Sequence, residues 1–259
     1  MTTLRRVAVP SGQGVAASLA GLLVLLAVLA TTVGLGLLAA VVGLACGLAL
    51  GAAVVRGLGS HGLGPGDLVT LSRATLACGL AALVADSLVR SPAVTAVVAL
   101  AVLALSLDAV DGRVARRTGT VSAFGGRFDG EADAFLLLVL SVYVARSAGA
   151  WVLAIGAARY LFGAAGWAWP WMRERLPFRY WRKVVTAVQG IVLCAAAADV
   201  VPPGPRDAAL ALALVLLAES FGRDVVWLWR RRPSRSVVPT GGAPHGRAPH
   251  GRATHGRAP

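Results

Sequence analysis

Four aspartates lie close together in the sequence, where one strongly apolar segment ends and another begins. Asp108 and Asp111 are three residues apart at the end of the first segment, and Asp129 and Asp133 are four apart at the start of the second. On an α-helix both spacings place the two carboxylates on one face. Two such pairs at a shared membrane boundary would form a cage of hard oxygen ligands, which suits Mg²⁺ or Mn²⁺. Because an ionisable group at membrane depth is costly, the sequence predicts a functional site here.

The composition of the chain is that of a helical membrane protein. Of its 259 residues 57% are hydrophobic and 14% are charged, and the mean hydropathy is +0.72. These values exclude an ordinary soluble domain and predict an all-α, polytopic membrane helical bundle. The formal net charge is +13, but the basic residues cluster in predicted loops instead of forming a stripe with interleaved aromatics. We therefore expect the lipid bilayer and anionic substrates as partners, and no nucleic acid.

Eight apolar segments divide the chain, and each has roughly the 20 residues that a helix needs to cross the hydrocarbon core. They are residues 14–31, 34–55, 68–89, 92–111, 127–146, 149–169, 183–201 and 207–229. We predict that residues 1–55 hold a basic N-terminal segment and an accessory transmembrane hairpin. A Gly/Pro-rich linker is expected over 56–67, a six-helix main domain over 68–229, and a disordered basic tail over 230–259.

The distribution of Lys and Arg predicts how these helices are oriented. With the N-terminus in the cytoplasm, the outside loops hold only Arg90, Arg146 and Arg206, and most of the 25 Lys and Arg residues fall on the cytoplasmic side. Such a bias follows the positive-inside rule. We therefore expect a multi-pass protein of the cell (plasma) membrane with both termini and the aspartates at the cytoplasmic face.

The polar and small residues around the aspartates follow the pattern D-x2-D-G-x2-A-R-x8-G-x3-D-x3-D. Its fixed positions are Asp108, Asp111, Gly112, Ala115, Arg116, Gly125, Asp129 and Asp133. The pattern resembles the motif of the CDP-alcohol phosphatidyltransferase family (class I, integral membrane), and all eight positions match. Together with the six apolar segments, the resemblance covers residues 66–229. It implies a six-helix phosphatidyltransferase core, to which the N-terminal two-helix hairpin is added.

The resemblance assigns metal and proton chemistry to the aspartates. It implies that Asp108, Asp111 and Asp129 bind Mg²⁺ or Mn²⁺, as two ions, and that Asp133 contacts a metal and acts as general base. The alternative is that the carboxylates only form ion pairs with nearby basic side chains. Those available in the sequence are Arg113, Arg116 and Arg127. Pairing alone would not fix the glycine spacings, so we favour the metal site.

The same motif predicts where the nucleotide lies. Gly112, Ala115 and Gly125 leave room for CDP to approach the backbone, and Arg116 suits a phosphate. A second patch, GDLVTLSR (66–73), resembles the PNxLTxxR start of the family's first helix. In that patch Thr70 and Arg73 match, while Gly66 and Asp67 replace Pro and Asn. We expect Asp67 and Thr70 to contact CDP, and for Arg73 we weigh a functional role against an interface residue that snorkels toward lipid headgroups.

Basic residues later in the chain are candidates for binding the acceptor. Lys183, Thr186 and Gln189 match part of the GKxKTxxQ stretch of glycerol-phosphate-using members, and Arg159 lies inside an apolar segment. An intramembrane arginine needs an anion or a carboxylate partner, and Glu219 is one that we expect to pair with Arg159 or Arg223. The residues that we predict to bind the acceptor are Arg159, Arg179, Arg182 and Lys183. The alternative for the stretch 167–183 is an aromatic belt with snorkelling bases.

The resemblance implies an enzyme that moves a phosphatidyl group from CDP-diacylglycerol to an alcohol acceptor with release of CMP. A phosphorylated polyol or phosphatidylglycerol is favoured, and glycerol phosphate, inositol phosphate and serine are all acceptors to test. Two other functions stay open from the sequence: a cation or proton transporter that uses the intramembrane carboxylates, and a catalytically inactive membrane scaffold. The resemblance is also compatible with a homodimer.

Overall fold

A computed structural model of the chain describes residues 9–58, 62–118, 123–174 and 180–231, with the backbone alone for residues 58, 109–118 and 123. The described residues form eight α-helices and two short 3₁₀ helices, η1 (Ala150–Val152) and η2 (Pro170–Arg173). The α-helices are α1 (Ser11–Thr32), α2 (Leu37–Leu58), α3 (Pro65–Ser87), α4 (Val94–Thr118), α5 (Ala123–Ala148), α6 (Leu153–Ala168), α7 (Tyr180–Ala197) and α8 (Pro203–Arg231). The all-α bundle predicted from the sequence is confirmed, and each α-helix overlaps one predicted apolar segment.

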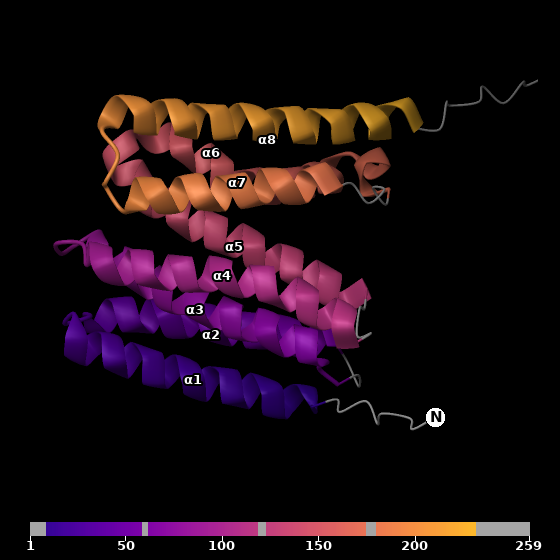
Figure 1. Ribbon diagram of the computed structural model, residues 1–259. Helices are drawn as coiled ribbons and strands as arrows, with labels where there is room; N and C mark the ends of the chain where they lie inside the picture. The colour runs from indigo at the N-terminus through magenta and orange to yellow at the C-terminus, as the bar shows by residue number, and fades with distance from the viewer. Residues whose placement is uncertain (1–8, 59–61, 119–122, 175–179, 232–259) are drawn as a thin grey trace, which may run out of the picture.

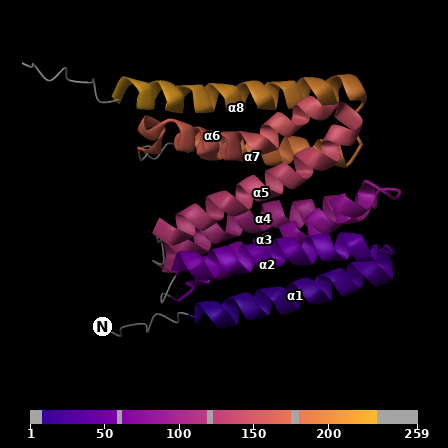
Figure 2. The same cartoon turned by 180° about the vertical axis from the view of Figure 1, so that it is seen from behind.

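The helices lie side by side in an elongated bundle, with α1 at one edge and α8 at the other (Figure 1). Helix α5 crosses this bundle diagonally and contacts α3 on one side and α6 and α7 on the other. The start of α1, the start of α5 and the end of α8 lie at the same end of the bundle, as the reverse view in Figure 2 also shows. We call this the α5 N-terminal end. Its placement at the cytoplasmic face stays a prediction.

Three helices meet the length and apolar composition needed to cross a membrane: α1, residues Leu37–Gly57 of α2, and α3. Residues Val94–Asp108 of α4 form a shorter apolar helix. Helices α1 and α2 expose large apolar side chains, among them Val24, Leu37 and Leu38. Apolar surface of this kind is typical of contact with lipid. The chain is therefore a membrane protein, whereas eight spans and the plasma membrane remain predictions.

The connection between α2 and α3 is shorter in the structure than the linker 56–67 predicted from the sequence. Helix α2 extends to Leu58 and α3 begins at Pro65, so that residues 59–64 separate the two helices. Leu63 is fully buried, and its backbone pairs with Val9 through two hydrogen bonds of 2.8 and 3.1 Å. It packs in a small apolar cluster with residues of α1, α2, α3 and α5, including Phe128 and Ala132. This cluster fixes the start of α3 against the start of α5. The division into domains stays a prediction.

Small residues allow α6 to lie very close to α5. A Cβ atom built on Gly156 would be 2.5 Å from the backbone Cα of Leu138 and 2.9 Å from the Ser141 hydroxyl. Packing of this kind, in which a glycine lets two backbones approach, is typical of helices in membranes. Because α6 carries Arg159, the Gly156 contact also sets the position of a predicted site residue.

We expect Gly156→Ala to lower the free energy of unfolding by about 1–3 kcal/mol, because the added methyl group must push α6 away from α5. The matched control is Gly163→Ala on the same helix, where a Cβ atom would meet nothing within 4 Å. Thermal unfolding of the two variants in the same detergent tests this. Equal midpoints for both variants would contradict the close packing of α5 on α6.

Candidate active site

Three of the predicted aspartates come together at the α5 N-terminal end of the bundle. Asp108 lies on α4, and Asp129 and Asp133 lie one turn apart on α5. Each offers a carboxylate oxygen, and these oxygens lie within 4.8 Å of one another. The packing of α4 and α5 in the bundle therefore brings these three of the four predicted carboxylates to one place. Each of the three side chains is only partly buried.

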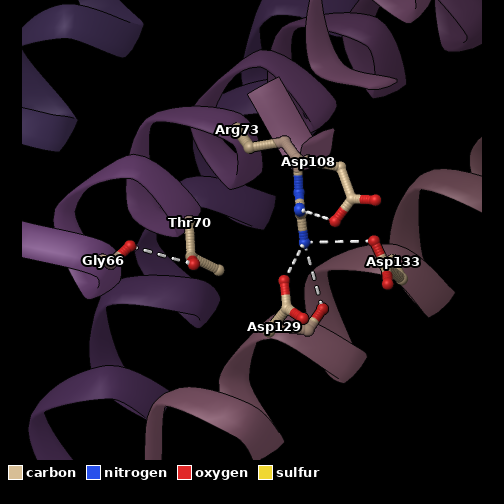
Figure 3. A network of polar contacts seen from close by, with 6 residues as sticks. All are labelled: Gly66, Thr70, Arg73, Asp108, Asp129 and Asp133. Atoms are coloured by element: carbon tan, nitrogen blue, oxygen red, sulfur yellow. Dashed lines mark hydrogen bonds and ion pairs between the residues drawn. The ribbon is translucent and has the colours of Figure 1, made fainter. Parts of the chain in front are cut away.

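Arg73, from α3, lies against all three carboxylates (Figure 3). Its Nη1 forms an ion pair with Asp108, and its Nη2 lies 2.8 Å from Asp129 Oδ1 and 3.0 Å from Asp133 Oδ1. Nη2 also donates to the backbone carbonyl of Asp129 at 3.1 Å. The side chain is 1% exposed. The alternative of a snorkelling interface residue is therefore wrong, because a snorkelling arginine keeps its charged group in water.

The charges of this cluster bear on whether it can hold a metal ion. One guanidinium faces three carboxylates, so these four side chains taken together carry an excess of negative charge. Partly exposed carboxylate oxygens with net negative charge are the ligands that Mg²⁺ and Mn²⁺ take in proteins. The residues present fit a divalent cation, and Asp108, Asp129 and Asp133 are the ones that would hold it.

Several predicted site residues lie where no side chain is described. Asp111, Gly112, Ala115 and Arg116 continue α4, but only their backbone is described, and Arg179 lies outside the described residues. The ion pairs that Arg113 and Arg116 were considered to form are not tested for the same reason. Gly125 lies in the first turn of α5 and is partly buried. The roles of these residues in binding metal, CDP or acceptor stay predictions.

Asp67 and Thr70, predicted to contact CDP, are buried near the start of α3. The carboxylate of Asp67 accepts a hydrogen bond of 2.9 Å from the Gly64 N–H, so it caps the helix, where a negative charge is favourable. The Thr70 hydroxyl donates to the Gly66 carbonyl at 3.2 Å (Figure 3). Neither residue lines the cavity described next. Their contact with CDP stays a prediction beside these structural roles.

A cavity of about 530 Å³ opens beside the carboxylates. Asp108, Asp129 and Asp133 contribute its acidic side chains. Its basic side chains come from α5, α6 and α7: Arg127, Arg159, Arg182 and Lys183. The cavity therefore combines a group of acids that suits a cation with a group of bases that suits an anion. Three of the four predicted acceptor residues line it.

Two of these basic side chains form ion pairs with carboxylates to which the sequence analysis gave no role. Arg159 Nη2 donates to Glu131 at 2.6 Å, and Arg182 Nε lies 3.6 Å from the buried carboxylate of Asp224. The predicted pairing of Glu219 with Arg223 is confirmed. Its alternative pairing with Arg159 is wrong, because Glu219 contacts Arg223 and accepts a 3.0 Å hydrogen bond from Trp181.

A functional role for Arg73 was weighed from the sequence, but its ion pairs with the aspartates were missed. A signal was present, since an arginine within an apolar segment needs a carboxylate partner, and the aspartates of the motif were candidates. The position of Arg73 in the sequence does not show that α3 packs against both α4 and α5, however. Only the structure shows these two contacts.

Comparison with known protein families bears on the function of this site. The sequence model of the CDP-alcohol phosphatidyltransferase family matches residues 66–219, which is more than half of the chain. The chain belongs to this family. Membership supports transfer of a phosphatidyl group from a CDP-alcohol in lipid synthesis, in a membrane. Searches of curated proteins and of solved structures gave no match.

We expect Arg73→Gln to lower the free energy of unfolding by about 3–5 kcal/mol, because three carboxylates would lose the guanidinium that they share. Added Mn²⁺ should raise the unfolding midpoint of this variant more than that of the wild type.

The control for Arg73→Gln is Arg90→Gln. It removes an ion pair between the exposed Arg90 side chain and Asp86, with a hydrogen bond to the Gly34 carbonyl, and should cost less than about 1 kcal/mol. Thermal unfolding of both variants, with and without Mn²⁺, measures the two effects. A variant at Arg73 that is as stable as the one at Arg90 would contradict the role of Arg73 as the counter-charge.

Proposed function

We propose that this chain transfers the phosphatidyl group of CDP-diacylglycerol to a hydroxyl group of an alcohol acceptor and releases CMP. The acceptor that we favour is a phosphorylated polyol or phosphatidylglycerol. The observation that carries the proposal is the cavity beside Arg73, in which three carboxylates and four basic side chains line the same space. A family of phosphatidyltransferases supplies the reaction type.

The carboxylates account for the donor half of the reaction. Asp108, Asp129 and Asp133 would hold Mg²⁺ or Mn²⁺, and by resemblance Asp111 would complete a site for two ions. A bound divalent ion neutralises negative charge on the diphosphate of the donor. By the same resemblance the CDP group would contact Gly112, Ala115, Arg116 and Gly125, which follow the aspartates in sequence.

Asp133 is the residue that we propose as general base. Its carboxylate lines the cavity and is 24% exposed, so an acceptor hydroxyl can reach it. The acceptor oxygen forms a bond to the phosphorus nearest the diacylglycerol, and the bond from that phosphorus to the oxygen of CMP breaks. CMP leaves with the electron pair of that bond, and Asp133 takes the proton from the acceptor hydroxyl. Arg73 holds the carboxylate of Asp133 in position through the 3.0 Å ion pair.

The basic side chains account for the acceptor half. Arg159, Arg182 and Lys183 line the cavity beside Asp133, and Arg179 is predicted to join them. Guanidinium and ammonium groups bind phosphate oxygens through charge-assisted hydrogen bonds. Their presence favours an acceptor that carries a phosphate over an uncharged alcohol. A homodimer in the bilayer remains an expectation of the resemblance.

We expect Asp133→Asn to lower CMP release by about 10²–10⁴-fold, because the amide cannot take the proton. The assay uses purified protein, CDP-diacylglycerol, Mn²⁺ and one acceptor at a time from glycerol phosphate, inositol phosphate, phosphatidylglycerol and serine. Glu174→Gln, which removes an exposed carboxylate outside the cavity, is the matched control. Equal rates for the two variants would exclude Asp133 as the base.

We expect Lys183→Gln to raise the KM for a phosphorylated acceptor about tenfold while the KM for CDP-diacylglycerol stays unchanged, because one charge-assisted contact to the acceptor is lost. Arg173→Gln is the control, since Arg173 lies outside the cavity and donates to the carbonyls of Gly166 and Trp167. An increase in the donor KM instead would place Lys183 on the donor side of the cavity.

A further inference from the structure

The cavity beside the carboxylates has a smaller branch that extends between α5, α6, α7 and α8. This branch has a volume of about 120 Å³ and shares Gly130, Asp133, Leu137, Arg159 and Thr186 with the main cavity. The shared residues show that the two spaces adjoin. We call the smaller one the branch pocket.

Gln189, on α7, lines the branch pocket and is 2% exposed. Its Nε2 has no hydrogen-bond acceptor among the described residues. A buried amide N–H that lacks an acceptor costs free energy, so such groups in folded proteins call for an explanation. A ligand oxygen in the branch pocket would supply the acceptor.

The other polar side chains of the branch pocket already have partners. Asp133 pairs with Arg73, Arg159 pairs with Glu131, and the Thr186 hydroxyl donates to the Arg182 carbonyl at 3.0 Å. The amide of Gln189 is therefore the group that is placed to recognise a neutral oxygen. It lies in the pocket that begins at Asp133.

The size and walls of the branch pocket limit what can enter it. A volume of about 120 Å³ corresponds to roughly four water molecules at their share of liquid volume, which is too small for an acyl chain. Ile155, Leu217 and Phe221 supply apolar walls that suit C–H groups, and Gln189 supplies an N–H donor. A short carbon chain that carries a hydroxyl group fits both features.

We infer that the branch pocket binds the hydroxyl-bearing part of the acceptor, and that the amide of Gln189 donates a hydrogen bond to a hydroxyl next to the one that attacks. The phosphate of the same acceptor would stay in the main cavity near Arg182 and Lys183. This inference rests on the proposed function and narrows it, because it requires a polyol phosphate with a second free hydroxyl.

The test compares glycerol 3-phosphate with 3-hydroxypropyl phosphate, which lacks the middle hydroxyl, as acceptors for the purified full chain with CDP-diacylglycerol and Mn²⁺. We expect the wild type to use glycerol 3-phosphate with a kcat/KM about threefold to tenfold higher, as one neutral hydrogen bond allows. Gln189→Met should abolish this preference and leave the KM for CDP-diacylglycerol unchanged. If only inositol 1-phosphate supports CMP release, the same comparison uses its monodeoxy analogues.

The matched control is Leu193→Ala, one turn further along α7, which removes a fully buried side chain outside the branch pocket. It should lower the unfolding midpoint and keep the preference, which separates acceptor recognition from a loss of packing. If Gln189→Met does not fold, equal use of the two acceptors by the wild type still overturns the inference.

The remaining outcomes separate this inference from the proposed function. A preference that persists in Gln189→Met, or CMP release with serine alone, would overturn the assignment of the branch pocket while phosphatidyl transfer stands. No CMP release with any acceptor would overturn the proposed function, and the assignment with it.

Discussion

The ion pairs between one buried arginine and three aspartates determine how the rest of the structure is arranged. Arg73, on α3, is almost fully buried, and a charged group there is tolerated only with close counter-charges. Asp108 on α4 and Asp129 and Asp133 on α5 supply them. Three helices must therefore meet at one point, because moving any of them would leave a charge without its partner. The ion pairs of Arg73 therefore fix the positions of both the site and these three helices.

Helix α5 also links the aspartates to the basic side chains of the cavity, because it crosses the bundle and contacts α6 and α7. One end of α5 carries the aspartates, and its middle packs closely on α6 at Gly156, so Arg159 on α6 reaches the same cavity. Helix α7 brings Arg182 and Lys183 to that cavity as well. The acids and bases are thus drawn from separate segments of the chain and combined by helix packing. This arrangement suits the transfer proposed above, from a nucleotide-linked donor to an anionic acceptor.

Much of this was predictable from the sequence, because its signals are local. The length of each apolar segment indicated the helices. The spacing of four residues placed Asp129 and Asp133 on one helix face, and the shared boundary of two apolar segments placed Asp108 beside them. Contacts between helices were not predictable in the same way. The sequence around Arg73 does not indicate which helices this side chain faces. Glu131 and Asp224 were overlooked as ion-pair partners, because a single sequence does not show that α5 faces α6 or that α7 faces α8.

The central claim is that the carboxylate cluster catalyses transfer from a CDP-linked lipid. The most direct test is to measure CMP released from CDP-diacylglycerol by the purified wild-type chain, while Mn²⁺ and the acceptor are added separately and together. The account predicts release only when both are present, and loss of release when the metal is chelated. Absence of CMP with every acceptor, although CDP-diacylglycerol and Mn²⁺ still bind, would contradict it and favour a scaffold without catalysis.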